Sequence, residues 1–438
     1  MKKSAVTLEL ARKSLPKITR IPASDLHRQV LESQPHRSRF VSGASGSGKT
    51  TLLIQRALQL LEGGRSSEGK NFDPIDPSRL LVLTFSRSHA DTLRDRIAIS
   101  AESVAREPIA RTFAALAFSI VRMALDEDVR EPILISGAEQ DQMIRSLLTS
   151  EFEVGNWPED LTKALATRGF AKELRDLISR AKEWGLSYSE LEALGTEAKD
   201  PNWIAAARFW KRMDEISIIR ESGVGDPKER IDPSELINRA ALFLEKSEEL
   251  RTRVASLFDH ILIDHFEESD PSHRRLLTAM VPKAVTIFYD TASTVSRFRG
   301  ADPEGLGRFL EDFAAKRSEM LPALDLGSSL RTEPISLAIE SDSIAGQARN
   351  IAEYLRSRHL RDGIAFSEMA VVVRSPGEHL ATIRRTLALS NIPVIQERGT
   401  QSLAESSAIK PLIMIAEIAL GIVPLEGELR TSRGVTPL

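Results

Sequence analysis

The sequence predicts an α/β fold, in which the strands of a parallel sheet alternate with helices and an all-helical insertion interrupts the sheet. The first observation is a set of short apolar runs typical of buried strands: residues 80–84, 261–263, 285–288 and 369–373. The second is the helical spacing of the segments between these runs. The third is a change at about residues 123–250, where helical spacing replaces the strand signals and predicts the insertion.

The first predicted strand leads into the most informative motif of the chain. Strand-like residues 39–41 and helical residues 51–58 enclose Gly43-Ala44-Ser45-Gly46-Ser47-Gly48-Lys49-Thr50. This matches G-x-x-x-x-G-K-[S/T], the P-loop, whose backbone N–H groups bind phosphate oxygens at a helix N-terminus. Lys49 would reach the β- and γ-phosphates, and the Thr50 hydroxyl would bind Mg²⁺. The alternative is a Gly/Ser-rich turn that happens to hold a lysine, but the flanking strand and helix favour ATP or GTP binding.

Polar and aromatic side chains follow later strands. Asp264 ends the strand 261–263 in the Walker B pattern, which would place it near Thr50 and Mg²⁺. Its alternative role is to cap the next element. The segment 83–87 ends another strand with polar, aromatic and basic groups, where open α/β sheets bind ligands. Phe298-Arg299 is an aromatic–cation pair ahead of a helix start, or else a loop with one packed Phe.

Composition excludes several other classes of protein. The chain has 438 residues, enough for several domains, with 42% hydrophobic and 28% charged residues. It has no cysteine, which excludes disulfides, thiolate metal sites and a cysteine nucleophile. Without a signal peptide or an apolar run long enough to span a bilayer, we expect a cytoplasmic protein with no membrane partner. A net charge of −3 neither requires nor excludes nucleic acid, which needs only a local basic face.

In this order and spacing, the segments resemble the superfamily 1A DNA helicases of the UvrD/Rep/PcrA type. The resemblance identifies motifs I, Ia, Ib, II, III and IV, in order, with residues 43–50, 84–87, 111–117, 263–271, 289–301 and 326–332. Motif II, usually V-D-E-F-Q-D-T-D-P, reads Ile263-Asp264-His265-Phe266-Glu267-Glu268-Ser269-Asp270-Pro271. The helical segment 168–195 resembles the AdnA-type subunit of the AdnAB helicase–nuclease.

The resemblance implies a P-loop NTPase with RecA-like parallel sheets. The implied divisions are an ATP-binding domain 1A at 20–122 and 251–320, a helical insertion 1B at 123–250, a partial second RecA-like domain 2A at 321–400, and the start of a truncated helical insertion 2B at 401–438. The implied function is ATP-dependent 3′→5′ translocation and strand separation in DNA repair or recombination. ATP and Mg²⁺ are the implied cofactors. Single-stranded DNA and duplex ends are the implied partners, with a helicase–nuclease subunit as a further one.

The resemblance also implies roles for single residues. The catalytic positions are Lys49, Asp264, His265 and Arg331, the last reaching the γ-phosphate from the second domain. The P-loop and Thr51 would bind nucleotide, and either Gln29 or His27 would read adenine. Thr50 and Asp264 would hold the metal. The DNA contacts would be Phe85, Arg87, Phe298 and Arg299.

The departures from the family pattern fall on the hydrolysis residues. His265 replaces the glutamate that activates water, Glu267 and Ser293 replace glutamines, and Leu330 replaces an adenine-stacking aromatic. Motifs V and VI have no counterpart, so we expect either a fragment or a truncated gene. These features support an alternative function, a non-catalytic nucleotide- and DNA-binding subunit of a heteromeric helicase–nuclease. An unrelated P-loop ATPase or kinase fits the motif order less well.

Overall fold

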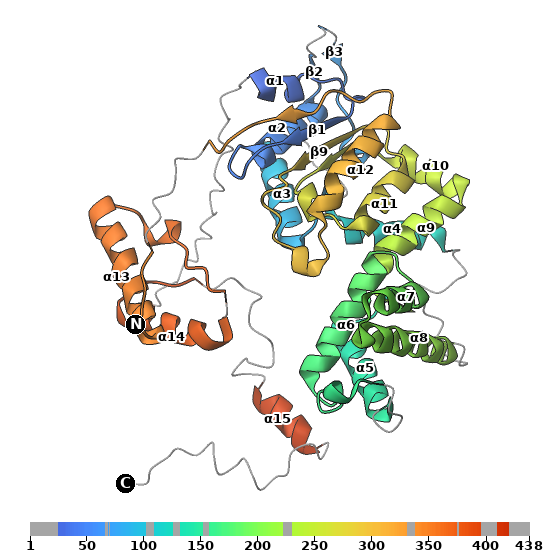
Figure 1. The fold of residues 1–438 in the computed structure, drawn as a ribbon. Coiled ribbons are helices and arrows are strands. Elements are labelled where there is room, and N and C mark those ends of the chain that lie inside the picture. Colours follow the sequence, from blue (N-terminus) through green and yellow to red (C-terminus); the bar gives the residue numbers. More distant parts are fainter. Residues whose placement is uncertain are drawn as a thin grey trace, which may run out of the picture. The chain divides into compact units, whose positions relative to one another are not determined.

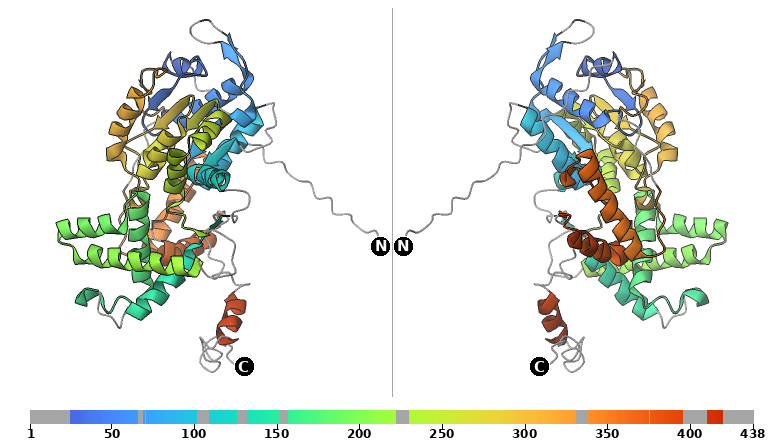
Figure 2. Two further views of the ribbon diagram at one scale, coloured as in Figure 1. Left: turned by 90° about the vertical axis from the view of Figure 1, so that its right-hand side faces the viewer. Right: turned by 90° about the vertical axis from the view of Figure 1, so that its left-hand side faces the viewer.

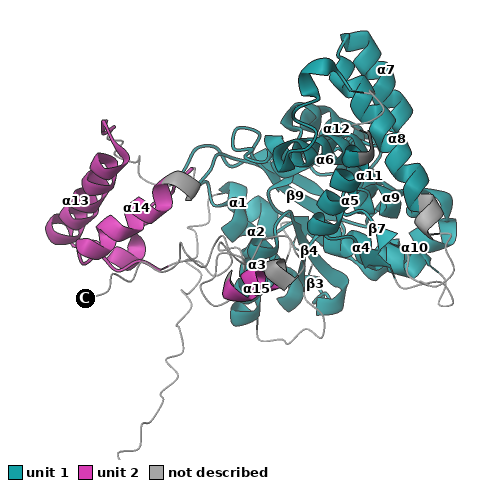
Figure 3. Cartoon of the chain, turned by 90° about the horizontal axis from the view of Figure 1, so that it is seen from below, with its two compact units in different colours: residues 1–332 teal, residues 333–438 magenta. Residues whose placement is uncertain are grey.

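The chain forms two compact units, Met1–Thr332 and Glu333–Leu438, and a parallel sheet lies at the centre of the first (Figure 1, Figure 3). The computed structural model describes residues 25–65, 69, 71–101, 109–125, 132–151, 157–221, 230–330, 338–374, 376–395 and 410–419. Within these ranges, no helix combines the length and the apolar character that a membrane crossing requires.

The central sheet has six strands, and all its neighbouring strands run parallel. In sheet order, they are β10 (Leu324–Asp325), β1 (Arg39–Ser42), β9 (Val285–Tyr289), β8 (His260–Ile263), β4 (Leu80–Thr84) and β5 (Ala110–Thr112). Successive residues of a strand point to opposite faces, so Leu81 packs into one hydrophobic core and Val82 into the other. Burial on both faces explains the continuous apolar runs and confirms the α/β fold class, with strands at 80–84, 261–263 and 285–288.

Helices cover both faces of the sheet. One core joins the sheet to α1 (Asp25–Leu31), α2 (Lys49–Glu62) and α3 (Arg87–Ser100). The core on the opposite face includes α4 (Phe113–Ala124), α9 (Leu236–Lys246), α10 (Glu248–Leu257), α11 (Pro271–Met280) and α12 (Pro303–Ala315). A short antiparallel hairpin of β2 (Gly64–Arg65) and β3 (Asn71–Phe72) follows α2.

Four further helices form the helical insertion around a separate hydrophobic core, whose large members include Trp157, Phe209 and Trp210. They are α5 (Gly137–Glu151), α6 (Arg168–Glu183), α7 (Tyr188–Ala198) and α8 (Pro201–Glu221). Both views in Figure 2 show this green group projecting from the sheet and its covering helices. The short strands β6 (Ile133–Leu134) and β7 (Arg230–Ile231) pair where the chain enters and leaves the insertion.

The packing differs from the expected insertion at its C-terminal end. The sequence predicts helical insertion up to residue 250, but α9 and the first residues of α10 pack into the core beneath the sheet. The apolar residues Ala240, Ala241 and Leu244 of α9 are buried there. Helical spacing alone does not distinguish a helix that covers a sheet from one that packs in an insertion.

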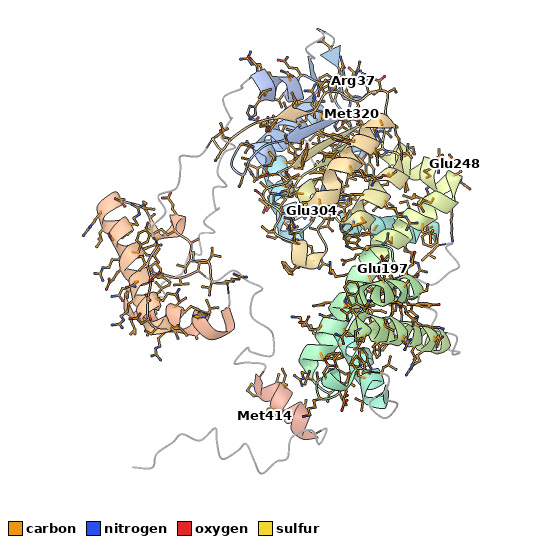
Figure 4. The ribbon with its side chains drawn as sticks, viewed as in Figure 1. Arg37, Glu197, Glu248, Glu304, Met320 and Met414 are labelled. Carbon is orange, nitrogen blue, oxygen red and sulfur yellow. The ribbon has the colours of Figure 1, made fainter. Side chains whose placement is uncertain are left out.

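The first unit extends beyond residue 320, the expected end of domain 1A. Ser38 forms a parallel bridge with Met320, and Arg37 lies 3.1 Å from Glu319, which places Arg37 and Met320 side by side (Figure 4). Strand β10 then pairs with β1 at the edge of the sheet. The sequence offers little sign of β10, because two residues are too few to show an apolar run or an alternation of apolar and polar side chains.

The second unit contains α13 (Ile344–Asp362), α14 (Pro376–Leu389) and α15 (Lys410–Ala419). Ala348 and Ala352 of α13 pack with Ile383 and Leu387 of α14 in a small core. The predicted strand at 369–373 is wrong, because within 338–374 and 376–395 no strand is formed. Val372 is 93% exposed and the segment has no described strand beside it, so its backbone lacks the pairing that defines a strand.

Candidate functional site

The candidate site lies at one edge of the central sheet, where strands β1, β4, β8 and β9 end. Leu83 of β4 is in register with Ile263 of β8, and Ile263 is in register with Ile287 of β9. The residues that follow parallel strands in register meet at the carboxyl edge of the sheet, the edge at which such sheets bind ligands. The P-loop, which follows β1, lies at the same edge because β1 pairs with β9.

The P-loop has the backbone conformation that phosphate binding requires. Gly46 and Gly48 have φ of 86° and 94°, in the left-handed region that glycine adopts without strain. A Cβ on Gly43 would come within 2.6 Å of Ser47 Oγ, so the loop closes tightly at this point. Helix α2 begins at Lys49, and the first N–H groups of a helix have no intrahelical acceptor. Loop and helix together therefore form an anion-binding site.

Lys49 is buried within this loop. Its ammonium group donates to the carbonyl oxygens of Gly43 at 2.6 Å and Ala44 at 3.0 Å. It also lies 3.6 Å from Asp290 Oδ2, and both side chains are more than 90% buried. Asp290, which follows β9, therefore supplies a counter-charge in this fold. The next residues after Lys49, Thr50 and Thr51, are partly buried in the first turn of α2.

Asp264 is fully buried and lies beside Thr50. The Thr50 hydroxyl donates to Asp264 Oδ2 at 2.8 Å, which brings together two residues from opposite ends of the first unit's sequence. Burial acts to raise the pKa of Asp264, but the hydrogen bond with His89 and the nearby charges hold it below its usual value. An ionised carboxylate and a hydroxyl beside the P-loop are oxygen ligands of the kind that Mg²⁺ takes, so these two residues fit that ion.

His265 opens the short 3₁₀ turn Phe266–Glu268 with φ of 58°, a left-handed conformation for a residue with a side chain. Its Nδ1 lies 3.0 Å from Glu267 Oε1, and its Nε2 lies 3.9 Å from Asp264 Oδ2. The hydrogen bond to Glu267 raises the pKa of His265 to about 9. Glu267 is itself fixed, because its Oε2 accepts from the backbone N–H of Asp290 at 3.0 Å.

His89 is a site residue that sequence reasoning did not identify. Its Nε2 lies 3.0 Å from Asp264 Oδ2, and its ring meets the ring of His265 edge-to-face with centroids 4.8 Å apart. Ser86 caps α3 by accepting from the backbone N–H of His89, which places this histidine in the first turn of the helix. The missing signal was strand order, because only the pairing of β4 with β8 brings this turn to Asp264.

The two candidates for adenine reading have different surroundings. Gln29 is exposed on α1, and its contact with the adenine stays a prediction. His27 is buried and hydrogen-bonded to the backbone of Ser47, and burial lowers its pKa. Successive residues of a helix point in different directions, and here His27 faces the P-loop. Leu330 also reaches the loop, where its backbone N–H donates to Gly46 at 3.1 Å. Arg331 lies outside the described residues.

The four candidate DNA contacts divide into exposed and packed side chains. Phe298 is 77% exposed, and the Arg299 guanidinium lies 5.3 Å from the centre of its ring. Arg87, the first residue of α3, is also exposed. Phe85 instead packs against the core, with its ring centroid 5.0 Å from that of Phe113. Phe85 is partly buried by these rings, so less of its surface is open than that of Phe298, and its contact with DNA stays a prediction.

The chain is similar to several curated proteins. It is 27% identical to DNA helicase IV of Escherichia coli (strain K12) over 334 residues, which covers 66% of this chain and 45% of the relative. It is 24% identical to DNA helicase II of Haemophilus influenzae over 293 residues, 64% of this chain and 36% of the relative. A 58-residue stretch, 13% of this chain, is 40% identical to an ATP-dependent helicase/nuclease protein of Limosilactobacillus fermentum and covers 4% of it.

The chain thus spans less than half the length of these relatives. The family described as the UvrD/REP helicase N-terminal domain matches residues 24–314, a stretch that runs from α1 through the sheet and the helical insertion to α12. This match includes the P-loop and all the residues around Asp264. The chain belongs to the UvrD/REP helicase family through this N-terminal domain.

Proposed function

We propose that this chain is the ATP-binding part of an ATP-dependent 3′→5′ DNA helicase or translocase that acts in DNA repair or recombination. The observation that carries the proposal is the convergence of Lys49, Thr50 and Asp264 at one edge of the sheet. Relatives named as DNA helicases support it. The proposed domains follow the sequence prediction, except that α9, the first residues of α10 and β10 are assigned to the motor domain 1A, which insertion 1B interrupts.

The site residues have distinct proposed roles. The N–H groups of the P-loop and of the first turn of α2 bind the phosphates, and Lys49 exchanges its carbonyl partners for phosphate oxygens. Thr50 and Asp264 hold Mg²⁺, which neutralises charge on the phosphates. Arg331 is proposed to approach the γ-phosphate. Arg87, Phe298 and Arg299 are proposed to contact single-stranded DNA, with the exposed Phe298 ring stacking on a base.

Nucleotide binding is the step to test first. The full chain is titrated with a fluorescent ATP analogue in the presence of Mg²⁺, beside Lys49→Ala and the matched control Lys172→Ala, whose lysine is exposed on α6. We expect Lys49→Ala to weaken binding at least about tenfold, because a charge-assisted contact contributes roughly 1.5–3 kcal/mol. Equal affinity in Lys49→Ala and the native chain would overturn the proposal.

The surroundings of His265 favour a second candidate function, that of a nucleotide- and DNA-binding subunit that hydrolyses ATP slowly. Both ring nitrogens of His265 face carboxylates, Glu267 on one side and Asp264 on the other. Nδ1 is hydrogen-bonded to Glu267, and the negative charge of Asp264 near Nε2 favours the protonated ring, so this imidazole is a poor proton acceptor for an attacking water. In this function the chain supports an active helicase–nuclease subunit, in line with the AdnA-type resemblance. Co-expression with the neighbouring genes tests it, and failure to co-purify with any such subunit counts against it.

A further inference from the structure

Two imidazoles converge on one oxygen of the buried Asp264. His89 arrives from the first turn of α3 after β4, and His265 follows Asp264 directly after β8. The distances to Asp264 Oδ2 are 3.0 Å from His89 Nε2 and 3.9 Å from His265 Nε2. The three ligand atoms that these residues can offer all lie within 4.8 Å of one another. Among the described residues, this is the group of histidines and carboxylates close enough to share one ion.

These separations suit a small transition-metal ion. Zinc binds imidazole nitrogen and carboxylate oxygen at about 2.0–2.2 Å, so neighbouring ligand atoms of a tetrahedral site lie about 3.3 Å apart. The two separations from Asp264 Oδ2, 3.0 Å and 3.9 Å, lie on either side of that value, and all three ligand atoms lie within 4.8 Å of one another, so small side-chain movements would close the site around an ion. Two nitrogens and one carboxylate also leave a further coordination position for a water or phosphate oxygen, as in catalytic zinc sites.

A second observation concerns the orientation of His265. Histidines that bind metal through one ring nitrogen commonly give the other N–H to a carboxylate, which fixes the ring and its tautomer. His265 Nδ1 lies 3.0 Å from Glu267 Oε1, and Glu267 is held by the N–H of Asp290. Glu267 is almost fully buried, so this support is part of the core rather than a surface contact. The arrangement leaves Nε2 as the nitrogen directed to Asp264.

We propose that His89, Asp264 and His265 bind a nitrogen-preferring divalent cation, with Zn²⁺ as the representative ion. Mg²⁺ takes oxygen ligands in an octahedral arrangement, whereas imidazole suits Zn²⁺ and Co²⁺. Each of the two ring nitrogens gives up the hydrogen that it directs to Asp264 before it binds the cation, and these protons are released to water. The inference concerns the protein without nucleotide. Its cation would share Asp264 with the Mg²⁺ of the proposed nucleotide site, so the two ions compete for that carboxylate, and the inference rests on the proposed function only in this respect.

The test is a metal titration of the full chain without nucleotide, after removal of bound metals with a chelator. Co²⁺ is the probe, because its visible absorption reports the coordination geometry, and Zn²⁺ and Mg²⁺ are then used as competitors. We expect Zn²⁺ to displace Co²⁺ at concentrations at least about a hundredfold lower than Mg²⁺. His89→Ala and His265→Ala should each weaken Co²⁺ binding by at least about tenfold, and Glu267→Gln by about 10–100-fold.

Two controls make the result specific. His36→Ala removes an exposed imidazole outside the cluster and should leave Co²⁺ affinity unchanged. Circular dichroism verifies that each variant is folded, and Glu267→Gln serves as the conservative variant if an alanine variant unfolds. Equal Co²⁺ affinity in the native chain, His89→Ala and Glu267→Gln would overturn the inference. Binding of the fluorescent ATP analogue by the same preparations is measured separately, so loss of the metal site alone leaves the nucleotide proposal standing.

Discussion

At the residue scale, we expect the rate at which bound ATP is hydrolysed to depend on the side chain that follows Asp264. We expect His265→Glu to raise the rate of ATP hydrolysis with single-stranded DNA at least about tenfold, because general-base catalysis contributes typically 10²–10⁴-fold. The measurement is phosphate release at saturating ATP, with His36→Glu as the control for an added carboxylate elsewhere. Fast DNA-stimulated hydrolysis by the native chain would contradict this role of His265, as would a variant that binds ATP but turns over no faster.

The same residues show how far the sequence predicts the site. Lys49, Thr50 and Asp264 are predictable because the P-loop spacing and a strand that ends in aspartate are local patterns. His89 is not, because its contact with Asp264 depends on which strands are neighbours. The choice between Gln29 and His27 depends on which side of α1 faces the P-loop. A helix of seven residues is too short for its sequence to predict that side. Phe85 shows the same limit, since the exposure of an aromatic ring depends on what packs beside it.

At the element scale, strand β8 carries a buried histidine whose proton affinity makes stability depend on pH. His260 is fully buried between the carbonyl of Pro35 and the hydroxyl of Thr286, at 2.6 Å and 2.9 Å. Burial lowers the pKa of His260 from 6.5 to about 3. Between these values the unfolded chain binds a proton that the folded chain does not. The stabilisation is therefore complete above about pH 6.5 and is lost as the pH falls toward 3.

The variant His260→Gln removes this titration. We expect its melting temperature to change less between pH 6.5 and pH 4 than that of the native protein, whatever its stability at neutral pH. Thermal unfolding followed by circular dichroism at a series of pH values provides the measurement. His36→Gln removes an exposed imidazole, and its melting temperature should change with pH as that of the native protein does. An unchanged slope in His260→Gln would show that other groups cause the loss of stability in acid.

The strands themselves were predictable where both faces are covered. Apolar runs at 80–84, 261–263 and 285–288 form central strands because helices bury them from both sides. The equally apolar run at 369–373 forms none, since a strand requires hydrogen bonds to a neighbour that lies elsewhere in the sequence. The two-residue strand β10 falls below the length at which a pattern can be recognised.

At the scale of the whole molecule, segments that follow one another in the sequence do not always pack in the same part of the fold. The helical insertion has its own hydrophobic core. The chain enters and leaves it through the paired strands β6 and β7. The sequence indicates the insertion because its helical spacing is continuous. The helices α9 and α10 continue that spacing but return to the sheet, so its C-terminal boundary becomes visible only in the contacts.

DNA binding also belongs to this scale, because the net charge of −3 gives the molecule no overall attraction to a polyanion. Affinity must then come from a local group of exposed side chains such as Phe298 and Arg299, whose guanidinium lies against the ring. Base stacking contributes roughly 1–3 kcal/mol, so we expect Phe298→Ala to weaken binding of a single-stranded oligonucleotide about 5- to 150-fold without sequence preference. Fluorescence anisotropy at low salt measures this effect.

Arg299→Ala should act differently, because we expect the Arg299 guanidinium to contact a phosphate of the strand rather than a base. Neutralising one phosphate contact lowers the slope of log affinity against log salt by about 0.7 for a single strand, so the variant should differ from the native protein mainly at low salt. Phe298→Ala should keep the native slope, since stacking releases no counterion. Leu257→Ala, which shortens a partly exposed side chain on α10, is the control for the loss of apolar surface. If both Phe298→Ala and Arg299→Ala bind the oligonucleotide as the native protein does at every salt concentration, the DNA path does not cross this turn of the first unit.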